Sequence, residues 1–501
     1  MVLPAKIIRA INQRGQLYEV GGAVRDRLRC ATSLDTGKID PARFWRHQPE
    51  ESDYLVTGMP MDELTAILKQ SGHVELVGKS FGVIKFKLQI ADTKLKIVDV
   101  ALPRRERSTG FGHRDFEIEY DPDLPVEEDL RRRDFTVNAI ALRITNYPSL
   151  RHGGTSTSSV YQLGTGELSL DFARDMRITK PELVDPYGGV RDIRDNVIRM
   201  VDPKAFEEDP LRMLRACQFA ARFEYAVEQD TFKAIKKHAA LIATVSTERV
   251  QQELNKLLAK AGQPSIGLWL MQRGGLLKMI LPELEAGVGV TQPGDFHRYT
   301  VFEHSIKTVD HVARDKRLEL RLAALLHDVA KPRCRELSDG RVHFYGHDRE
   351  GETLVRSILE RLKYSRDIIQ KVSSLVRQHM FAYPETEKGL RRLIAKAGVR
   401  GMYDLIDLRR ADILAQGKAG EEATKFLDQF EQLITEEIHK NQPFSLKDLA
   451  VGGEDLMKEF KLKTGPKVGQ LLNHLLEHVL EHPSKNIRDE LLTEAARWLS
   501  R

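Results

Sequence analysis

The sequence predicts an α/β fold in the N-terminal part of the chain and an almost entirely helical remainder. Three apolar segments between residues 73 and 102 alternate with a period of two, as strands do, and segments with helical spacing precede them. From about residue 200 onward, nearly every segment has helical spacing, interrupted at glycines and prolines. We therefore expect a small mixed sheet with helices on one side, followed by helical domains.

The composition is that of an ordinary globular protein. The 501 residues predict two to four domains, and 41% hydrophobic with 30% charged residues is typical of a soluble chain. The net charge of +5 is small for this length, so overall charge does not by itself indicate a nucleic-acid partner. Local clusters of arginine do indicate one, at residues 104–107 and 131–133.

We expect neither a secretion signal nor a membrane span. The N-terminal residues lack a long apolar core followed by a small-residue cleavage site, and no apolar run reaches about 18 residues. The three cysteines, Cys30, Cys217 and Cys334, are scattered and odd in number, which argues against a disulfide framework or a zinc ribbon. These observations predict a cytoplasmic protein with no membrane partner.

The N-terminal elements follow one another in a regular order. Residues 5–20 predict a helix leading to a strand that ends at Gly21 and Gly22, where a second helix begins. Polar stretches near 31–50 and 145–180 predict two insertions. Further strands are expected at 54–58, 73–78, 82–90 and 95–102, with a helix at 61–72.

Three carboxylates are candidates for metal binding and catalysis. Glu51 and Asp53 alternate, so on a strand both side chains would point to one face, and Asp99 lies in a later strand. Carboxylates converging from neighbouring strands can hold two Mg²⁺ ions, which orient a triphosphate and lower the pKa of an attacking hydroxyl. The alternative is that these acids simply face solvent at the ends of strands.

Two further motifs indicate a phosphate partner. The pair Gly21–Gly22 lets the backbone approach a phosphate at a strand–turn–helix junction, and Arg25 would brace the turn. Arg132 and Arg133, in the run RRDFTVNA, supply guanidinium forks for a triphosphate. The alternatives are an ordinary tight turn and a basic helix face.

The segment EEDPLRMLR at 207–215 is a candidate for base selection. Asp209 can cap a helix and Pro210 suits the first turn of one. Asp209 accepts hydrogen bonds and Arg212 donates them, so together they can match the edge of a base. Taken alone, the segment is also explained by a capped helix with an ion pair between residues three apart.

In this order the motifs resemble those of the tRNA nucleotidyltransferase/poly(A) polymerase family, in its bacterial CCA-adding branch, over roughly residues 5–500. The resemblance implies a nucleotidyltransferase-type head with Mg²⁺, followed by an all-α neck, body and tail. It implies template-independent addition of C, C and A to the 3′ end of tRNA from CTP and ATP. Glu51 departs from the family, which has aspartate at that position.

The resemblance also implies roles for single residues. Arg132 and Arg133 would contact the triphosphate and the ribose. Asp134 would bind the ribose hydroxyls, and Asn138 would orient the sugar or a phosphate. Arg215, together with Glu208, would hold the pair Asp209–Arg212 in place. Residues 103–119 resemble the mobile loop that switches the family from CTP to ATP, the alternative being an ordinary hairpin.

A second constellation lies in the helical part. Separate helical segments carry histidines and aspartates, and they resemble the metal site of HD-type phosphohydrolases, which would take Ni²⁺, Mn²⁺ or Mg²⁺ and hydrolyse a phosphoester such as a 2′,3′-cyclic tRNA end. The alternative is a degenerate site kept for its shape. The candidate ligands are His304, His327, Asp328, His347, His379 and Asp412.

Several functional alternatives remain open on sequence alone. A poly(A) polymerase is disfavoured by the run Gly78–Gly82 and by Lys85, which depart from its signature. The other functional alternatives are an enzyme that adds only CC, a protein that is chiefly an HD phosphohydrolase, and a non-catalytic RNA-binding protein. No protein partner is implied.

The expected domains are 1–201 (head), 202–285 (neck for base selection and RNA binding), 286–418 (HD body) and 419–501 (tail for tRNA binding).

Overall fold

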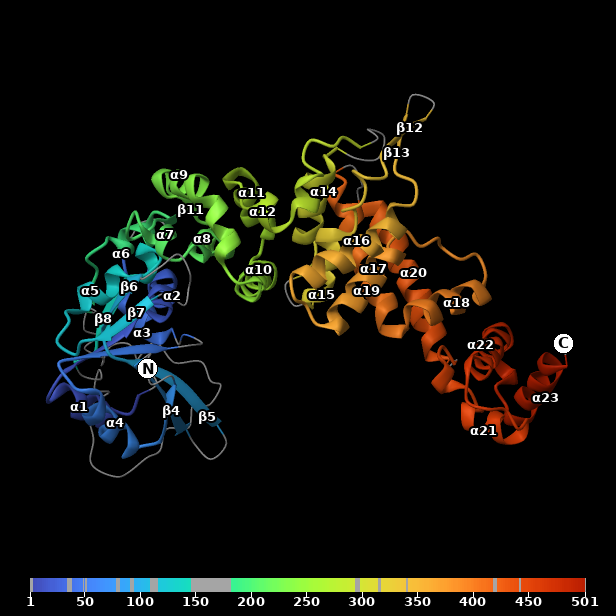
Figure 1. The fold of residues 1–501 in the computed structure, drawn as a ribbon, viewed down its shortest axis with the longest axis horizontal. Helices are drawn as coiled ribbons and strands as arrows, with labels where there is room; N and C mark the ends of the chain where they lie inside the picture. Colours follow the sequence, from blue (N-terminus) through green and yellow to red (C-terminus); the bar gives the residue numbers. More distant parts are fainter. Residues whose placement is uncertain are drawn as a thin grey trace. The chain divides into compact units, whose positions relative to one another are not determined.

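The chain forms two compact units in the computed structural model, residues 1–246 and 247–501 (Figure 1). The predicted insertion near 31–50 contains helix α3 (Pro41–Arg46), whereas the one near 145–180 lies outside the described residues. The structure describes residues 3–33, 38–47, 49, 52–77, 82–90, 94–108, 116–145, 182–292, 298–313, 317–338, 341–417, 421–440 and 443–500.

The first unit is built on a seven-stranded mixed sheet in the order β3-β4-β5-β2-β1-β8-β9. Strand β2 pairs with β1 antiparallel and with β5 parallel, so the predicted mixed sheet is confirmed. The strands are β1 (Gln16–Val20), β2 (Asp53–Thr57), β3 (His73–Val77), β4 (Val83–Ile90), β5 (Lys94–Ala101), β8 (Ala141–Arg143) and β9 (Leu183–Val184).

Side chains alternate between the two faces along each strand, so the sheet has an apolar surface on both faces. Tyr54 and Val56 of β2 pack with α1 (Ala5–Asn12) and α4 (Met61–Lys69) in one core. Leu55, between them, points the other way and packs with residues of α5 (Val126–Arg131). Asp53 therefore shares the face of Leu55, opposite to α1 and α4, because side chains two apart on a strand lie on one face.

Helix α2 (Gly22–Ala31) is fixed to the sheet by a buried ion pair. The Arg27 guanidinium donates to the Glu19 carboxylate of β1, with 2.9 Å between Nε and Oε2, and both side chains are almost fully buried. Arg27 also donates to the carbonyl of His47, which follows α3. The pair thus joins β1, α2 and the end of α3.

Residues 103–119 begin and end as a hairpin. Strands β6 (Arg104–Ser108) and β7 (Phe116–Tyr120) pair antiparallel, with Arg105 opposite Glu119. The centre of this segment, expected as a mobile loop, lies outside the described residues. The remaining elements of the unit are η1 (Thr136–Asn138), α6 (Gly189–Arg194), β10 (Val197–Ile198), α7 (Ala205–Glu208), α8 (Leu211–Phe223), β11 (Ala226–Val227), α9 (Gln229–His238) and η3 (Ala239–Thr244).

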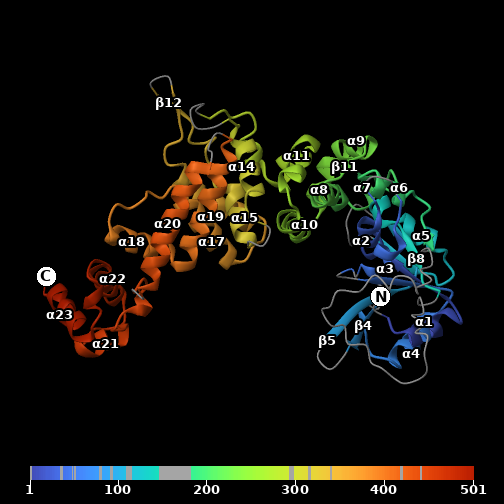
Figure 2. The ribbon, with the colours of Figure 1, turned by 180° about the vertical axis from the view of Figure 1, so that it is seen from behind.

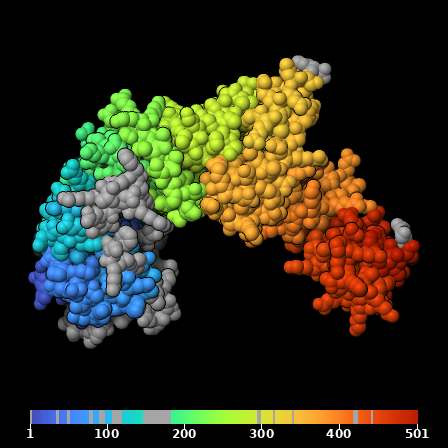
Figure 3. All heavy atoms as spheres, viewed as in Figure 1, coloured from blue at the N-terminus to red at the C-terminus, as the bar shows by residue number. Residues whose placement is uncertain are grey.

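The second unit is helical. Figures 1 and 2 show α14, α15, α17 and α19 side by side, and in the space-filling view the yellow and orange part of the chain presents a continuous surface (Figure 3). Its helices are α10 (Thr247–Lys260), α11 (Pro264–Gly274), α12 (Leu277–Ile280), α13 (Pro282–Glu285), α14 (Val301–Asp310), α15 (Leu318–Leu326), α16 (His347–Arg361), α17 (Arg366–Gln378), α18 (Glu387–Ala397), α19 (Val399–Ala415), α20 (Glu421–His439), η4 (Leu446–Asp448), α21 (Gly453–Glu459), α22 (Pro466–Glu481), η5 (Pro483–Lys485) and α23 (Arg488–Leu499).

The predicted fold class, a mixed-sheet head followed by a helical region, is confirmed. Two small strand pairs interrupt the helical region: β10 with β11, parallel, and β12 (Glu336–Ser338) with β13 (Arg341–His343), a hairpin. A search of the described helices finds none with the length and apolar character that a membrane crossing requires. The bounds of the four expected domains stay predictions.

Candidate functional site

Two of the three predicted catalytic carboxylates are neighbours on the sheet. Asp53 of β2 is the direct register partner of Asp99 of the parallel strand β5, so both point to the face away from α1 and α4. Asp53 is exposed and Asp99 partly so, whereas Ser52 is buried. Lys85 of β4 lies opposite Asp99 on its other side. Glu51 lies outside the described residues.

The glycine turn before α2 is tightly packed against an arginine. Gly21 has φ of +72°, and a Cβ atom built there would lie 2.5 Å from Nη1 of Arg133. Its own N–H donates to the carbonyl of Ile140, at 3.2 Å. Glycine is therefore required here both by the backbone angle and by the approach of the guanidinium.

A hydrogen-bonded chain of four side chains joins α2, η1 and α8. Arg25 donates from Nη1 to Oδ1 of Asn138 at 2.6 Å, and Asn138 donates from Nδ2 to Oδ1 of Asp134 at 2.9 Å. The other oxygen of Asp134 accepts from Arg215 of α8, at 2.8 Å from Nε. Arg25 also lies over the ring of Phe223, 4.6 Å from its centroid. We name these four residues, Arg25, Asn138, Asp134 and Arg215, the polar chain.

The charge of Asp134 is stabilised inside the protein. Burial raises the pKa of this carboxyl, but the positive charge of Arg215 and the hydrogen bond from Asn138 outweigh burial, so the pKa lies below its ordinary value. For Arg133, burial lowers the pKa of the guanidinium, against the opposing effect of Asp129. Asp134 is therefore an ionised acceptor at neutral pH.

One buried acid was missed by the sequence-based analysis. Asp129 of α5 is fully buried and holds both predicted phosphate-binding arginines, with Oδ1 2.8 Å from Nη2 of Arg132 and Oδ2 3.7 Å from Nη2 of Arg133. The spacing of three and four residues in EEDLRRR was the available signal. Asp129 fixes the direction of the two forks.

The two predicted base-selecting residues have separate partners in the structure. Asp209 accepts from the N–H of Leu211 at 3.2 Å, as a helix-capping side chain does. Arg212 donates to the carbonyl of Arg132 at 2.7 Å and to Glu208 at 3.2 Å. Glu208 thus contacts Arg212, and Arg215 bonds Asp134; the expectation that Glu208 and Arg215 hold the pair Asp209–Arg212 in place stays a prediction.

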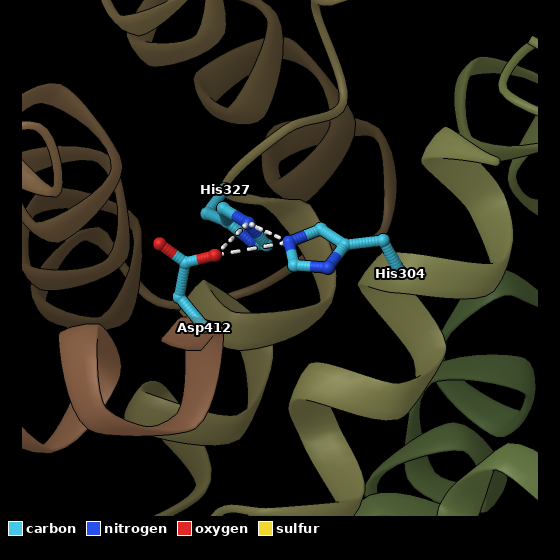
Figure 4. A group of neighbouring side chains, drawn as sticks. All are labelled: His304, His327 and Asp412. Atoms are coloured by element: carbon cyan, nitrogen blue, oxygen red, sulfur yellow. Dashed lines mark hydrogen bonds and ion pairs between the residues drawn. The ribbon is translucent and has the colours of Figure 1, made fainter. Parts of the chain in front are cut away.

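In the second unit the structure brings together all six predicted histidines and aspartates, which we name the histidine–aspartate centre. They form two groups of three, each with ligand atoms within 4.8 Å of one another. In the first group, Nε2 of His304 lies 3.0 Å from Oδ1 of Asp412 and 3.2 Å from Nε2 of His327 (Figure 4). The second group is Asp328, His347 and His379.

Three of the four imidazoles are oriented by the backbone carbonyl three residues earlier. Nδ1 of His327, His347 and His379 lies within 2.6–2.9 Å of the carbonyl oxygen three residues earlier, which can only accept. Nδ1 therefore carries the proton and Nε2 presents its lone pair. Together with the carboxylates, imidazoles that present Nε2 in this way fit a divalent transition ion.

Burial and neighbouring charges set the protonation of the centre. Burial lowers the pKa of His379 to about 3, helped by the nearby His327, so its imidazole is neutral at pH 7. Burial disfavours the charged form of Asp328, but His327 and Lys331 outweigh it and hold the pKa well below its usual range. The carboxylates are therefore ionised and His379 is neutral, whereas Asp328 outweighs burial and raises the pKa of His327, so metal binding would release a proton from that imidazole.

The centre opens into a cavity with two cationic residues that the sequence-based analysis missed. The cavity has a volume of about 970 Å³, and its wall includes Asp328, His347, His379 and Asp412. Lys331 lies 2.6 Å from Asp328, and Arg409 lies 3.8 Å from Asp412. Each cationic residue lies three positions from an aspartate: Lys331 after Asp328 in HDVAK, and Arg409 before Asp412 in RRAD. This spacing was the signal available in the sequence.

The geometry of the first unit defines the class of protein. Adjacent strand aspartates, a glycine turn and an arginine beside that turn are parts that a nucleotidyltransferase needs. Sequence profiles agree: residues 17–150 match the poly A polymerase head domain, 224–287 the probable RNA and SrmB-binding site of polymerase A, and 349–495 a putative second domain of tRNA nucleotidyltransferase. The chain belongs to the tRNA nucleotidyltransferase/poly(A) polymerase family and is an enzyme of that class.

Curated relatives differ in the activity that their names state. The A-adding tRNA nucleotidyltransferase of Deinococcus radiodurans is 34% identical over 69% of this chain and 73% of the relative. The CC-adding enzyme of Thermus thermophilus is 33% identical over 62% and 75%. The multifunctional CCA protein of Paracidovorax citrulli is 31% identical over 82% and 85%.

The fold is shared with solved structures. The CCA-adding enzyme of Bacillus stearothermophilus, solved with CTP, superposes with a TM-score of 0.64 and 21% identity, covering 99% of this chain and 98% of that one. At this identity the likeness establishes the fold only.

Proposed function

We propose that the chain adds C, C and A to the 3′ end of tRNA from CTP and ATP, without a nucleic-acid template. The observation that carries this proposal is the pairing of Asp53 with Asp99 on one face of the sheet. In each step the 3′ oxygen of the tRNA bonds to the α-phosphorus and the bond to pyrophosphate breaks. The names of the curated relatives support tRNA as the substrate.

Asp53 and Asp99, with Glu51 by sequence position, would hold Mg²⁺. Bound there, the ions supply charge that activates the 3′-hydroxyl and neutralises the triphosphate. Two side-by-side carboxylates fit this ion, because magnesium prefers oxygen ligands and is held by one or two carboxylates plus substrate phosphates.

The remaining residues bind and orient the nucleotide. Arg132 and Arg133, aligned by Asp129, would receive the triphosphate beside the glycine turn, where Arg133 approaches Gly21. Asp134 and Asn138 would receive the ribose. Arg212 is held by Glu208 at the start of α8, so we assign the base edge to it and to Asp209.

Nucleotide incorporation on three tRNAs tests the proposal. The tRNAs end before the first C, before the second C and before the final A, with CTP and ATP offered separately. The proposal expects C on the first two and A on the third. Addition of A alone, of CC alone, or of a long A tail would replace it by the A-adding, CC-adding or poly(A) polymerase activity.

We propose a second activity for the second unit, metal-dependent hydrolysis of a phosphoester. It is supported by the six ligand-type side chains of the histidine–aspartate centre and by the cavity above it. In this reaction a water oxygen bonds to phosphorus, the ester bond breaks, and the water proton passes to the leaving oxygen. Nickel, manganese or magnesium would supply the Lewis acid.

Hydrolysis of a nucleoside 2′,3′-cyclic phosphate with added Ni²⁺ or Mn²⁺ tests this activity. The double change His327→Ala with Asp328→Ala should abolish it and leave nucleotide addition largely unchanged, because the head has its own carboxylates. Absence of metal-stimulated hydrolysis in the wild-type protein would contradict the second activity.

A further inference from the structure

We propose that Phe219 and Phe223 of α8 are positioning residues: their rings align α8 with α2, and this alignment lets one nucleotide contact both helices at once. Neither residue is among those assigned to the metal, the triphosphate, the ribose or the base. The inference rests on the nucleotide-binding part of the proposed function and does not depend on which nucleotide is added.

The two ends of a nucleotide would bind at the starts of two different helices. The glycine turn at the start of α2, with Arg133 beside it, would receive the triphosphate. Asp209 and Arg212, at the start of α8, would receive the base. Because a nucleotide is one covalent unit, both of its ends can bind together only if the two helices keep a fixed spacing.

Guanidinium groups of α2 and aromatic rings of α8 join these helices. The guanidinium carbon of Arg25 lies 4.6 Å from the ring centroid of Phe223 and 5.3 Å from that of Phe219. The guanidinium carbon of Arg29, four residues further along α2, lies 4.1 Å from the ring centroid of Phe223. The two rings are stacked, with centroids 5.5 Å apart and an angle of 9° between their planes. We name Phe219 and Phe223 the ring pair.

Burial strengthens the contact between Arg25 and the ring pair. The side chains of Arg25, Phe219 and Phe223 are all buried, whereas Arg29 is exposed. A cation over an aromatic ring contributes more to stability where water is excluded. Arg25 is therefore the stronger of the two links from α2 to the ring pair.

The ring pair also lies beside both ends of the polar chain. Arg25 is the end on α2, and Arg215, the end on α8, lies 5.2 Å from the ring centroid of Phe219. Asp134, between these ends, is held by direct hydrogen bonds from its own partners. The ring pair therefore contributes a fixed spacing between the two helices, and the hydrogen bonds orient the acid that would receive the ribose.

Alignment of the helices affects a whole nucleotide more than either of its halves. A ligand that bridges two sites reaches the second site at an effective concentration that depends on how the two sites are held. Loosening α2 against α8 should therefore weaken the binding of CTP. Tripolyphosphate, which needs only the start of α2, and cytidine, which needs the polar chain and the start of α8, should bind as before.

Inhibition of nucleotide incorporation tests the alignment. Phe223→Leu keeps an apolar side chain and removes the ring. We expect this change to raise KM for CTP about tenfold, a loss of about 1.4 kcal/mol. The competitive inhibition constants of tripolyphosphate and of cytidine should each change by less than about twofold, because each half uses one helix only. Phe219→Leu should act in the same direction.

Two matched variants serve as controls. Phe223→Tyr keeps the ring, and Phe223 lines a cavity of about 380 Å³ that can accept the added hydroxyl, so KM for CTP should stay at the wild-type value. Phe86→Leu removes a fully buried ring from the core formed with α1 and α4, and it should leave KM for CTP unchanged. Circular dichroism would show that each variant folds.

Three outcomes would overturn the inference: an unchanged KM for CTP in Phe223→Leu, an equal rise in the inhibition constant of tripolyphosphate or cytidine, or the same rise in KM in Phe86→Leu. A wild-type protein that adds only A would be compared in the same way with ATP and adenosine. If the wild-type protein incorporates no nucleotide, the proposed function fails. Equilibrium dialysis with labelled CTP and Mg²⁺ then gives the same comparison of the ligand with its two halves.

Discussion

Asp134 is the residue on which the head's polar chain converges. It accepts from Asn138 and from Arg215, and its burial would make an unpaired charge costly. The same two contacts that would position a ribose therefore also stabilise the fold, so binding and stability are linked at this residue.

The pH dependence of the free energy of unfolding should reveal the contribution of the Asp134 charge. Its folded-state pKa lies below the ordinary value of about 3.9, so its ionisation stabilises the fold above that pH, and the contribution is lost as the pH falls through the folded-state pKa. We expect Asp134→Asn to be less stable than wild type at pH 6. The difference should shrink steadily below about pH 4.

Urea unfolding at several pH values would measure this difference. Trp45 is the one tryptophan of the three that belongs to the first unit, so a chain with Trp269→Phe and Trp498→Phe reports on the head by fluorescence. A difference between the two proteins that does not change between pH 6 and pH 3 would contradict the assignment.

Gly21 should be far less tolerant of a side chain than its neighbour. Gly21→Ala combines a backbone angle that alanine avoids with a clash against Arg133, and backbone strain alone costs about 1–3 kcal/mol. At Gly22 an added Cβ would lie 3.4 Å from Nη2 of Arg25, a contact that a flexible end can relieve. We expect Gly21→Ala to raise KM for CTP at least tenfold and Gly22→Ala to change it less, measured by steady-state incorporation.

At the scale of elements, the buried pair Glu19–Arg27 determines how α2 sits on β1. Removing one partner of a buried ion pair leaves an uncompensated charge, which costs about 3–5 kcal/mol. Arg27→Met should therefore lower the free energy of unfolding of the head by about that amount.

The matched control is an exposed pair in the same unit. Arg43 and Asp40, at the start of α3, lie 3.6 Å apart with both side chains largely exposed, and such pairs contribute about 0–1 kcal/mol. Arg43→Met should therefore have little effect in the same urea experiment. Similar losses in the two variants would show that the pair Glu19–Arg27 is not what fixes α2.

Elements with a strong period could be predicted from the sequence, whereas side-chain partners could not. The strand containing Asp99 and the helix at 61–72 were recognisable because apolar residues repeat at the spacing of their element. The neighbours Asp53 and Asp99 are 46 positions apart, and only the order of strands in the sheet makes them partners. No local pattern encodes that order.

For the same reason, the helix of the base-selecting segment could be predicted from the sequence, whereas the partners of its side chains could not. The helix that begins at Leu211 and its capping by Asp209 follow from local residue types. The bond between Arg215 and Asp134 joins residues that are distant in sequence, so no local pattern could predict it. In the second unit, by contrast, the resemblance to the HD-type metal site picked out the six ligands, although it could not give the distances between them.

At the scale of the molecule, each unit has its own core and its own candidate site. The head packs around the strands of the sheet, and the second unit around α14 to α19. Ion binding to the second unit should therefore stabilise that unit without changing the head.

Thermal unfolding with and without Mn²⁺ would test this independence. An ion at 100 times its dissociation constant adds about 2.7 kcal/mol to the stability of the state that binds it. In a chain that carries Asp53→Ala and Asp99→Ala, so that Mn²⁺ binds only the second unit, we expect Mn²⁺ to raise Tm where only Trp269 reports and to leave Tm unchanged where only Trp45 reports. Equal shifts in both would contradict separate binding, and His347→Ala with His379→Ala should reduce the first shift.

Two helices of the second unit end at the histidine–aspartate centre: His327 directly follows α15, and His379 directly follows α17. Aligned peptide dipoles make the C-terminal end of a helix electrically negative. These two helix ends therefore favour a cation at the centre, whereas His347 lies at the N-terminal end of α16, which is electrically positive. The centre thus offers both signs of potential: one suits an ion, and the other suits the phosphate that the ion would hold.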